Sequence, residues 1–164
     1  MLVQPKTKQY VMKAIKKTFQ MNALVDRMVY VLQVKFAMVQ ASDKLHHELA
    51  HHYPLIADRL ADPLLDFNED VFRPSVEEES KDYADMVSIF EELLTETIVL
   101  NGMLRDAREA ADEAGDSNIR VAMDKIIDTF QPYIKQAIIL RDKAVLYAGD
   151  IKDFDRDFDK FWLM

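Results

Sequence analysis

The chain has 164 residues, no cysteine and a formal net charge of -8. This length predicts one domain that buries a core without disulfides or a structural metal. The lack of cysteine excludes a disulfide framework, a thiolate metal site and a thiol nucleophile. No segment has the roughly 18 apolar residues of a membrane span, and no signal peptide is evident at the N-terminus. We therefore expect a cytoplasmic protein that does not enter a membrane.

The charges are distributed unevenly along the chain. Residues 1–35 carry a net charge of +6 and the remainder carries -14. We expect residues 1–7 to form a flexible basic arm. Nucleic-acid binding is one interpretation, because lysines that neutralise phosphates bind DNA without sequence preference. The other is a solvated helix face. Both interpretations concern the same five side chains, Lys6, Lys8, Lys13, Lys16 and Lys17.

Apolar residues recur at helical spacing from about residue 8, which predicts a first helix over 8–41. Ser42 and Asp43 are typical helix caps and predict that a second helix begins at 43 and continues to about 61. Pro54 lies inside the second helix and predicts a kink or a division there, because proline removes a backbone hydrogen bond. Residues 62–80 lose the helical spacing and predict a long crossover connection.

Two long helices, over residues 82–114 and 117–148, follow the crossover. Gly115 predicts the short turn between them, because glycine readily takes the left-handed conformation that ends a helix. Residues 149–164 predict an extra amphipathic helix, with phenylalanines on one face and aspartates on the other, packed on the bundle or on a neighbouring subunit. The sequence therefore predicts an all-α protein: a four-helix bundle over residues 8–148, with the crossover between its second and third helices.

This arrangement is ferritin-like, and several segments resemble the Dps-type mini-ferritins. The likeness extends over about residues 20–148 and is carried, in order, by residues 22–36, 45–49, 53–60, 91–94 and 108–116. The resemblance implies a hollow homo-oligomer that oxidises and stores iron. For family members with basic tails it also implies DNA binding.

The histidines are the most unusual feature of the sequence, since all four lie between His46 and His52. Imidazoles at i and i+4, such as His47 and His51, can share a transition-metal ion on a helix surface. The alternative is a polar outer face that contains histidine by chance, with His46 and His52 at the edges of the buried stripe. The predicted ligands are Asp43, His47, Glu48, His51, His52 and Asp58, and the expected metal is iron or another transition metal.

A dinuclear iron site inside the bundle is not predicted, because the inward positions of the first and fourth helices carry almost no carboxylate and no histidine. Glu48 and His51 have the spacing of a Glu-x-x-His pair, but they do not both point inward. The sequence therefore does not decide whether the protein has ferroxidase-type activity. Two functions remain: an oligomeric Dps-like or ferritin-like protein that binds metal, and a bundle that has lost this chemistry and acts as a structural or interaction protein.

Overall fold

The computed structural model describes residues 2–164, so that Met1 of the predicted arm lies outside the described residues. Every regular element in this range is a helix, which confirms the all-α prediction. The elements are α1 (Pro5–Val34), α2 (Val39–Glu48), the 3-10 turn η1 (Ala50–His52), α3 (Tyr53–Asp66), α4 (Met86–Ala114), α5 (Ser117–Leu146) and α6 (Ile151–Phe161).

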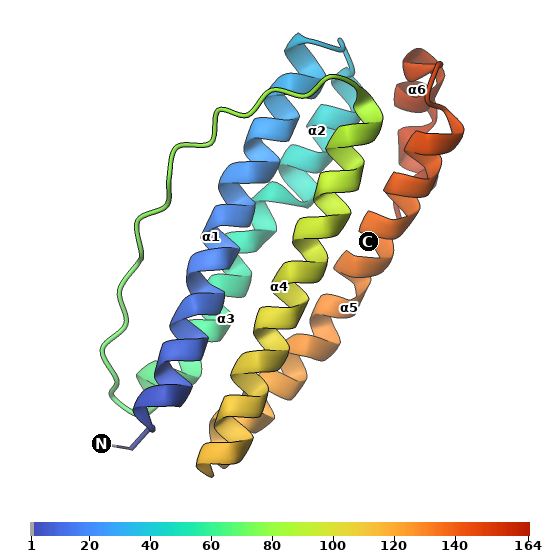
Figure 1. The fold of residues 1–164 in the computed structure, drawn as a ribbon. Helices are drawn as coiled ribbons and strands as arrows, with labels where there is room; N and C mark the ends of the chain where they lie inside the picture. Colours follow the sequence, from blue (N-terminus) through green and yellow to red (C-terminus); the bar gives the residue numbers. More distant parts are fainter. Residues whose placement is uncertain (1) are drawn as a thin grey trace.

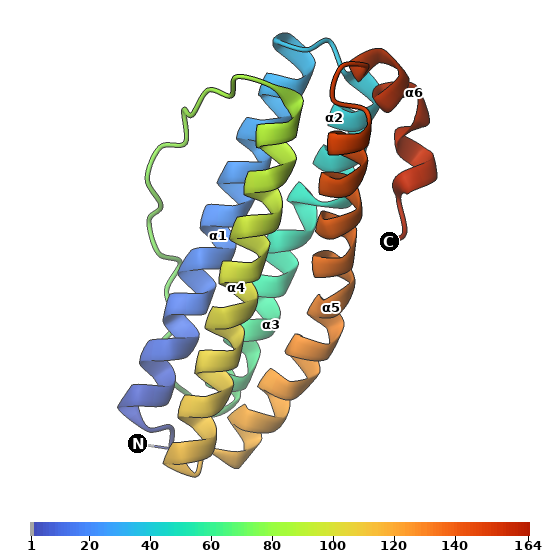
Figure 2. The same ribbon diagram turned by 45° about the vertical axis from the view of Figure 1, so that its right-hand side comes forward.

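Four rods form the bundle, because α2, η1 and α3 together make one broken rod antiparallel to α1 (Figure 1). Residues 67–85 have no helix and run along the full length of the bundle, from the end of α3 to the start of α4. The second rod and α4 therefore run in the same direction, as the predicted crossover requires. Figure 2 shows α6 folded back against the end of the bundle where α2 begins.

The core is formed by the inward stripes of the four rods. Its largest fully buried side chains include Met21 and Met28 of α1, Tyr53 and Leu60 of α3, and Phe90 of α4. Phenylalanines of α6 extend this core, and α6 packs against α2 and α5. No helix among residues 2–164 is long and apolar enough to cross a membrane.

Two predicted boundaries of the first helix were wrong. Residues 5–7 are helical, since α1 begins at Pro5, and proline is favoured in the first helical turn. At the other end α1 stops at Val34, where Ala37 takes a positive φ of 53° and the Met38 amide donates to the Leu32 carbonyl at 2.9 Å. The chain therefore turns at Ala37, and this turn divides the predicted 8–41 helix into α1 and the start of α2.

The start of the second helix also differs from the prediction, because α2 begins at Val39 and its own residues do not cap it. A carboxylate from the C-terminal helix does so instead: Asp155 of α6 accepts from the Gln40 amide at 3.3 Å and from the Ala41 amide at 2.7 Å. These amides belong to the unpaired donors of a helix N-terminus. The cap that Ser42 and Asp43 were expected to supply therefore comes from a residue more than 100 positions away.

Candidate metal centre

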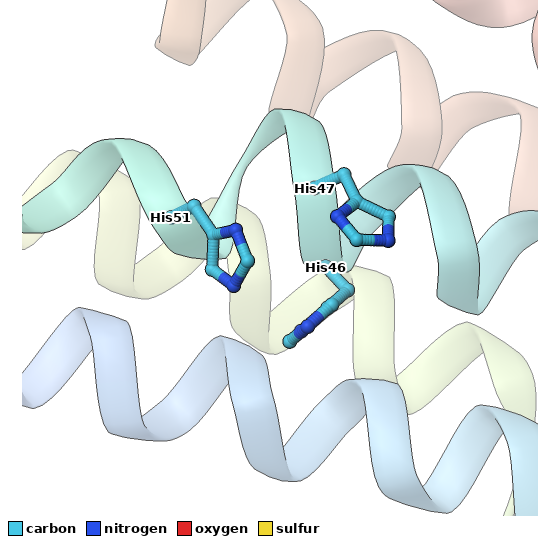
Figure 3. Close-up of side chains that lie close together, drawn as sticks. All are labelled: His46, His47 and His51. Carbon is cyan, nitrogen blue, oxygen red and sulfur yellow. The ribbon is translucent and has the colours of Figure 1, made fainter.

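Three of the four histidines converge at the break in the second rod. His46 and His47 lie in the last turn of α2 and His51 lies in η1. Figure 3 shows the three rings gathered on one side of the rod, with His46 lying between the rod and α1. The ring centroids are 4.9 Å apart for His46 and His47, 4.3 Å for His46 and His51, and 5.5 Å for His47 and His51.

The spacing of the nitrogens is suited to a metal ion with small side-chain movements. Each ring offers one nitrogen, and these nitrogens all lie within 4.8 Å of one another. In a tetrahedral site with metal–nitrogen bonds of about 2.0–2.1 Å, two ligand nitrogens lie roughly 3.3 Å apart. His47 and His51 are exposed and His46 is half-buried, so the His47 and His51 rings can rotate to bring their nitrogens to this separation. Imidazole ligands of this kind suit zinc, copper, nickel and iron.

Carboxylates lie behind two of the rings. Asp26 of α1 places Oδ1 3.5 Å from His46 Nδ1, and both atoms are buried and have no hydrogen-bond partner. Asp43 places Oδ1 3.4 Å from His47 Nε2. A carboxylate at one ring nitrogen favours the proton on that nitrogen and leaves the other free to bind a metal. The available nitrogens are therefore Nε2 of His46 and Nδ1 of His47.

The structure brings together only part of the predicted ligand set. His47 and His51 belong to the cluster, and Asp43 lies beside it as a partner of His47. His52, Glu48 and Asp58 are not members of the group. His46 belongs to it, although we expected it at the edge of the buried stripe. Sequence spacing missed His46 because its ring meets His51 five residues later, which an uninterrupted helix does not allow.

The five lysines predicted to bind DNA lie on α1, and most of them face acidic groups. Lys6 pairs with Glu113 at 2.9 Å, Lys8 with Glu69 at 3.4 Å, and Lys17 is in close contact with Glu96. Among the described residues, Lys13 and Lys16 form no ion pair, and Lys13 lies over the Tyr10 ring at 4.9 Å. The positive charge of the segment is therefore largely neutralised by the crossover and by α4.

Within residues 2–164, the interior of the bundle has no ligand set for a dinuclear metal site. Among residues 2–164, the buried polar side chains are Thr7, Thr18, Ser42, Thr97, Gln136 and Asp157, and the one carboxylate in this group belongs to α6. Tyr53 is fully buried near the middle of the second rod, and burial raises the pKa of its hydroxyl. The described interior is therefore unsuited to holding paired iron ions, which need several carboxylates.

Comparison with known proteins finds likeness in structure rather than in sequence. No protein-family model and no curated protein sequence matches the chain. Two structures of an open pore ferritin from the hyperthermophilic archaeon Archaeoglobus fulgidus have TM-scores of 0.89 at 13% identity, with 99% of this chain and 98–99% of those chains covered. A humanized archaeal ferritin has a TM-score of 0.86 at 10% identity over 99% of this chain and 98% of that one. The protein therefore has the fold of a ferritin from end to end.

Proposed function

We propose that this protein is a ferritin-like homo-oligomer that binds a divalent transition-metal ion at the surface cluster of His46, His47 and His51. The observation that supports the proposal is the convergence of three imidazole nitrogens within 4.8 Å, with a carboxylate behind two of the rings. Iron is the first metal to test, because the fold is that of ferritins. Zinc, cobalt, nickel and copper suit the same nitrogens.

The proposed chemistry is binding of an ion at the surface and not oxidation of paired ions in the bundle. Three neutral imidazoles leave at least one position on a tetrahedral ion for water or another ligand. Ferroxidase activity would need several carboxylates inside the bundle, and the described interior contains one, Asp157 of α6. Protection of DNA, which the resemblance to Dps proteins implies, stays a prediction. Of the five lysines predicted to bind DNA, Lys13 and Lys16 form no ion pair within the described residues and are the ones left to contact phosphates.

Metal titration of purified protein tests the proposal. The protein is stripped with a chelator and titrated by calorimetry with Zn²⁺, with Co²⁺ and, without oxygen, with Fe²⁺. We expect one ion per chain. The double variant His47→Ala/His51→Ala should reduce the affinity by at least about 100-fold, because only one imidazole remains. His52→Ala is the matched control and should leave binding unchanged. Equal binding by the double variant and the wild type would remove these residues as ligands.

One observation favours a second function. The apolar interior is what a ferritin-like bundle would contain if it had lost its metal chemistry and acted as a structural or interaction protein. In that case the wild type binds none of the three metals, and the histidine variants differ from it in no metal assay. The same titration therefore separates the two functions.

A further inference from the structure

We infer that the break in the second rod assembles the metal centre, and that Asn22 and Pro54 are positioning residues for it. The inference rests on the proposed function, because it explains how the three histidines reach one ion. It adds two residues, on α1 and α3, that hold no metal themselves.

The positions of the histidines show why a break is required. On an uninterrupted α-helix, residues i and i+5 lie about 140° apart around the axis and about 7.5 Å apart along it. His46 and His51 would then face different directions. In the structure their ring centroids lie 4.3 Å apart, the shortest separation in the cluster. The backbone changes between them, where Leu49 has φ -128° and ψ -61° and η1 begins. The break therefore supplies the third ligand.

Pro54 explains the position of the break. In an α-helix the amide of residue 54 would donate to the carbonyl of residue 50, but proline has no N–H group. Ala50 is fully buried, so that its carbonyl needs another donor. The Asn22 side chain of α1 provides one, since its Nδ2 donates to the Ala50 carbonyl at 2.8 Å. The sequence therefore removes one backbone hydrogen bond and replaces it from the neighbouring helix.

The same face of α1 contacts the chain on both sides of the break. Asn22 and Asp26 are four residues apart and so lie on one face of the helix. Asn22 binds the backbone at Ala50, after the break, and Asp26 contacts the His46 imidazole before it. α1 thus fixes where His46 and His51 stand relative to each other. An ion bound by both rings should stabilise the broken form, and the broken form should raise the affinity for the ion.

A thermodynamic cycle tests this inference. Asn22→Leu/Pro54→Ala removes the side-chain donor and restores a backbone donor for Ala50, which favours a continuous helix. We expect Zn²⁺ affinity to fall on the order of tenfold or more, as it does when groups that orient a ligand are lost. His46→Ala should weaken binding by a similar factor in the wild type and by less than about twofold in the double variant, since there His46 no longer faces His51.

Controls keep the outcomes separate. Pro63→Ala alters the other proline inside α3, at a distance from the cluster, and should leave Zn²⁺ affinity unchanged. Pro54→Ala alone retains the Asn22 donor and replaces the double variant in the experiment if the double variant does not fold. This single variant should also lower the Zn²⁺ affinity. A wild type that binds none of Zn²⁺, Co²⁺ and Fe²⁺ overturns the proposed function. A wild type that binds Zn²⁺, with Pro54→Ala and the double variant binding it equally well, overturns only this inference.

Discussion

At the scale of single residues, the half-buried imidazole of His46 depends on one carboxylate. Asp26 Oδ1 lies 3.5 Å from its Nδ1, and the side chains are only about a third exposed, at 35% for His46 and 29% for Asp26. A partly buried carboxylate in this position holds the ring orientation and makes the remaining nitrogen a better metal ligand. Asp26 therefore belongs to the proposed metal centre as the partner of His46 and not as a ligand.

Replacing Asp26 by asparagine should weaken Zn²⁺ binding on the order of tenfold, because the charge that orients His46 is lost. The measurement is a calorimetric titration of the stripped protein. Asp58→Asn is the matched control, since Asp58 is an exposed aspartate of the second rod outside the cluster. A loss of affinity with Asp58→Asn and none with Asp26→Asn would show that the ligand arrangement differs from the one described.

At the scale of elements, α6 is held by polar contacts as well as by its phenylalanines. Asp157 accepts from the Tyr147 hydroxyl at 3.0 Å, which joins α6 to the end of α5. Its other carboxylate oxygen lies 3.0 Å from Arg156. Arg156 and the Tyr147 hydroxyl hold the pKa of Asp157 well below its usual range. The Gln136 side chain donates to the Phe161 carbonyl at 2.9 Å and so fixes the end of the helix.

The lowered pKa of Asp157 predicts how the docking of α6 depends on pH. A carboxyl whose pKa is lower in the folded state stabilises that state above the unfolded pKa of about 3.9, and this contribution is lost as pH falls toward the folded pKa. Trp162, the one tryptophan of the chain, follows α6 and reports its docking by fluorescence. We expect the fluorescence of the wild type to show a loss of docking below about pH 4.

Asp157→Asn should remove this pH-dependent part of the transition, and it should loosen α6 already at neutral pH. Asp159→Asn is the matched control, because Asp159 is exposed and lies 3.8 Å from Lys44 in a surface ion pair. Such pairs contribute little to stability. Identical acid profiles for the wild type and Asp157→Asn would contradict the prediction.

At the scale of the whole molecule, α1 and α5 finish and α2 begins at the same end of the bundle (Figure 1). Apolar side chains of these segments remain exposed. Val34 is 85% exposed, Val39 58% and Leu146 73%. Exposed apolar side chains at one end of a molecule can be buried by packing against another chain. This end is therefore a candidate surface for association between copies of the chain.

We expect a solution mass well above the 19.1 kDa of one chain, measured by sedimentation or light scattering. Val34→Glu combined with Leu146→Glu should lower the mass, because two charges would then be buried in the contact. Val121→Glu is the control, since Val121 is 42% exposed on α5 near its opposite end. A wild type with the mass of one chain would contradict the homo-oligomer proposal.

The sequence by itself determined the features that depend on neighbours in the chain. Helical spacing predicted the four rods and the amphipathic C-terminal helix, Gly115 predicted the hairpin turn, where its φ is +75°, and Pro54 predicted the break. The pair His47 and His51 was also predicted, because residues four apart share one face of a helix.

Only the tertiary structure decided which groups from distant parts of the chain meet. His46 joins the cluster because the helix is broken between it and His51, at a position that Pro54 and Asn22 set. A prediction from helical spacing assumes an unbroken helix and therefore could not include His46. Asp155 caps α2 across 114 positions, and acidic residues far along the chain neutralise Lys6, Lys8 and Lys17. Periodicity reports which face a residue occupies on its own helix. It contains no information on the opposing helix, where charges and hydrogen bonds find their partners.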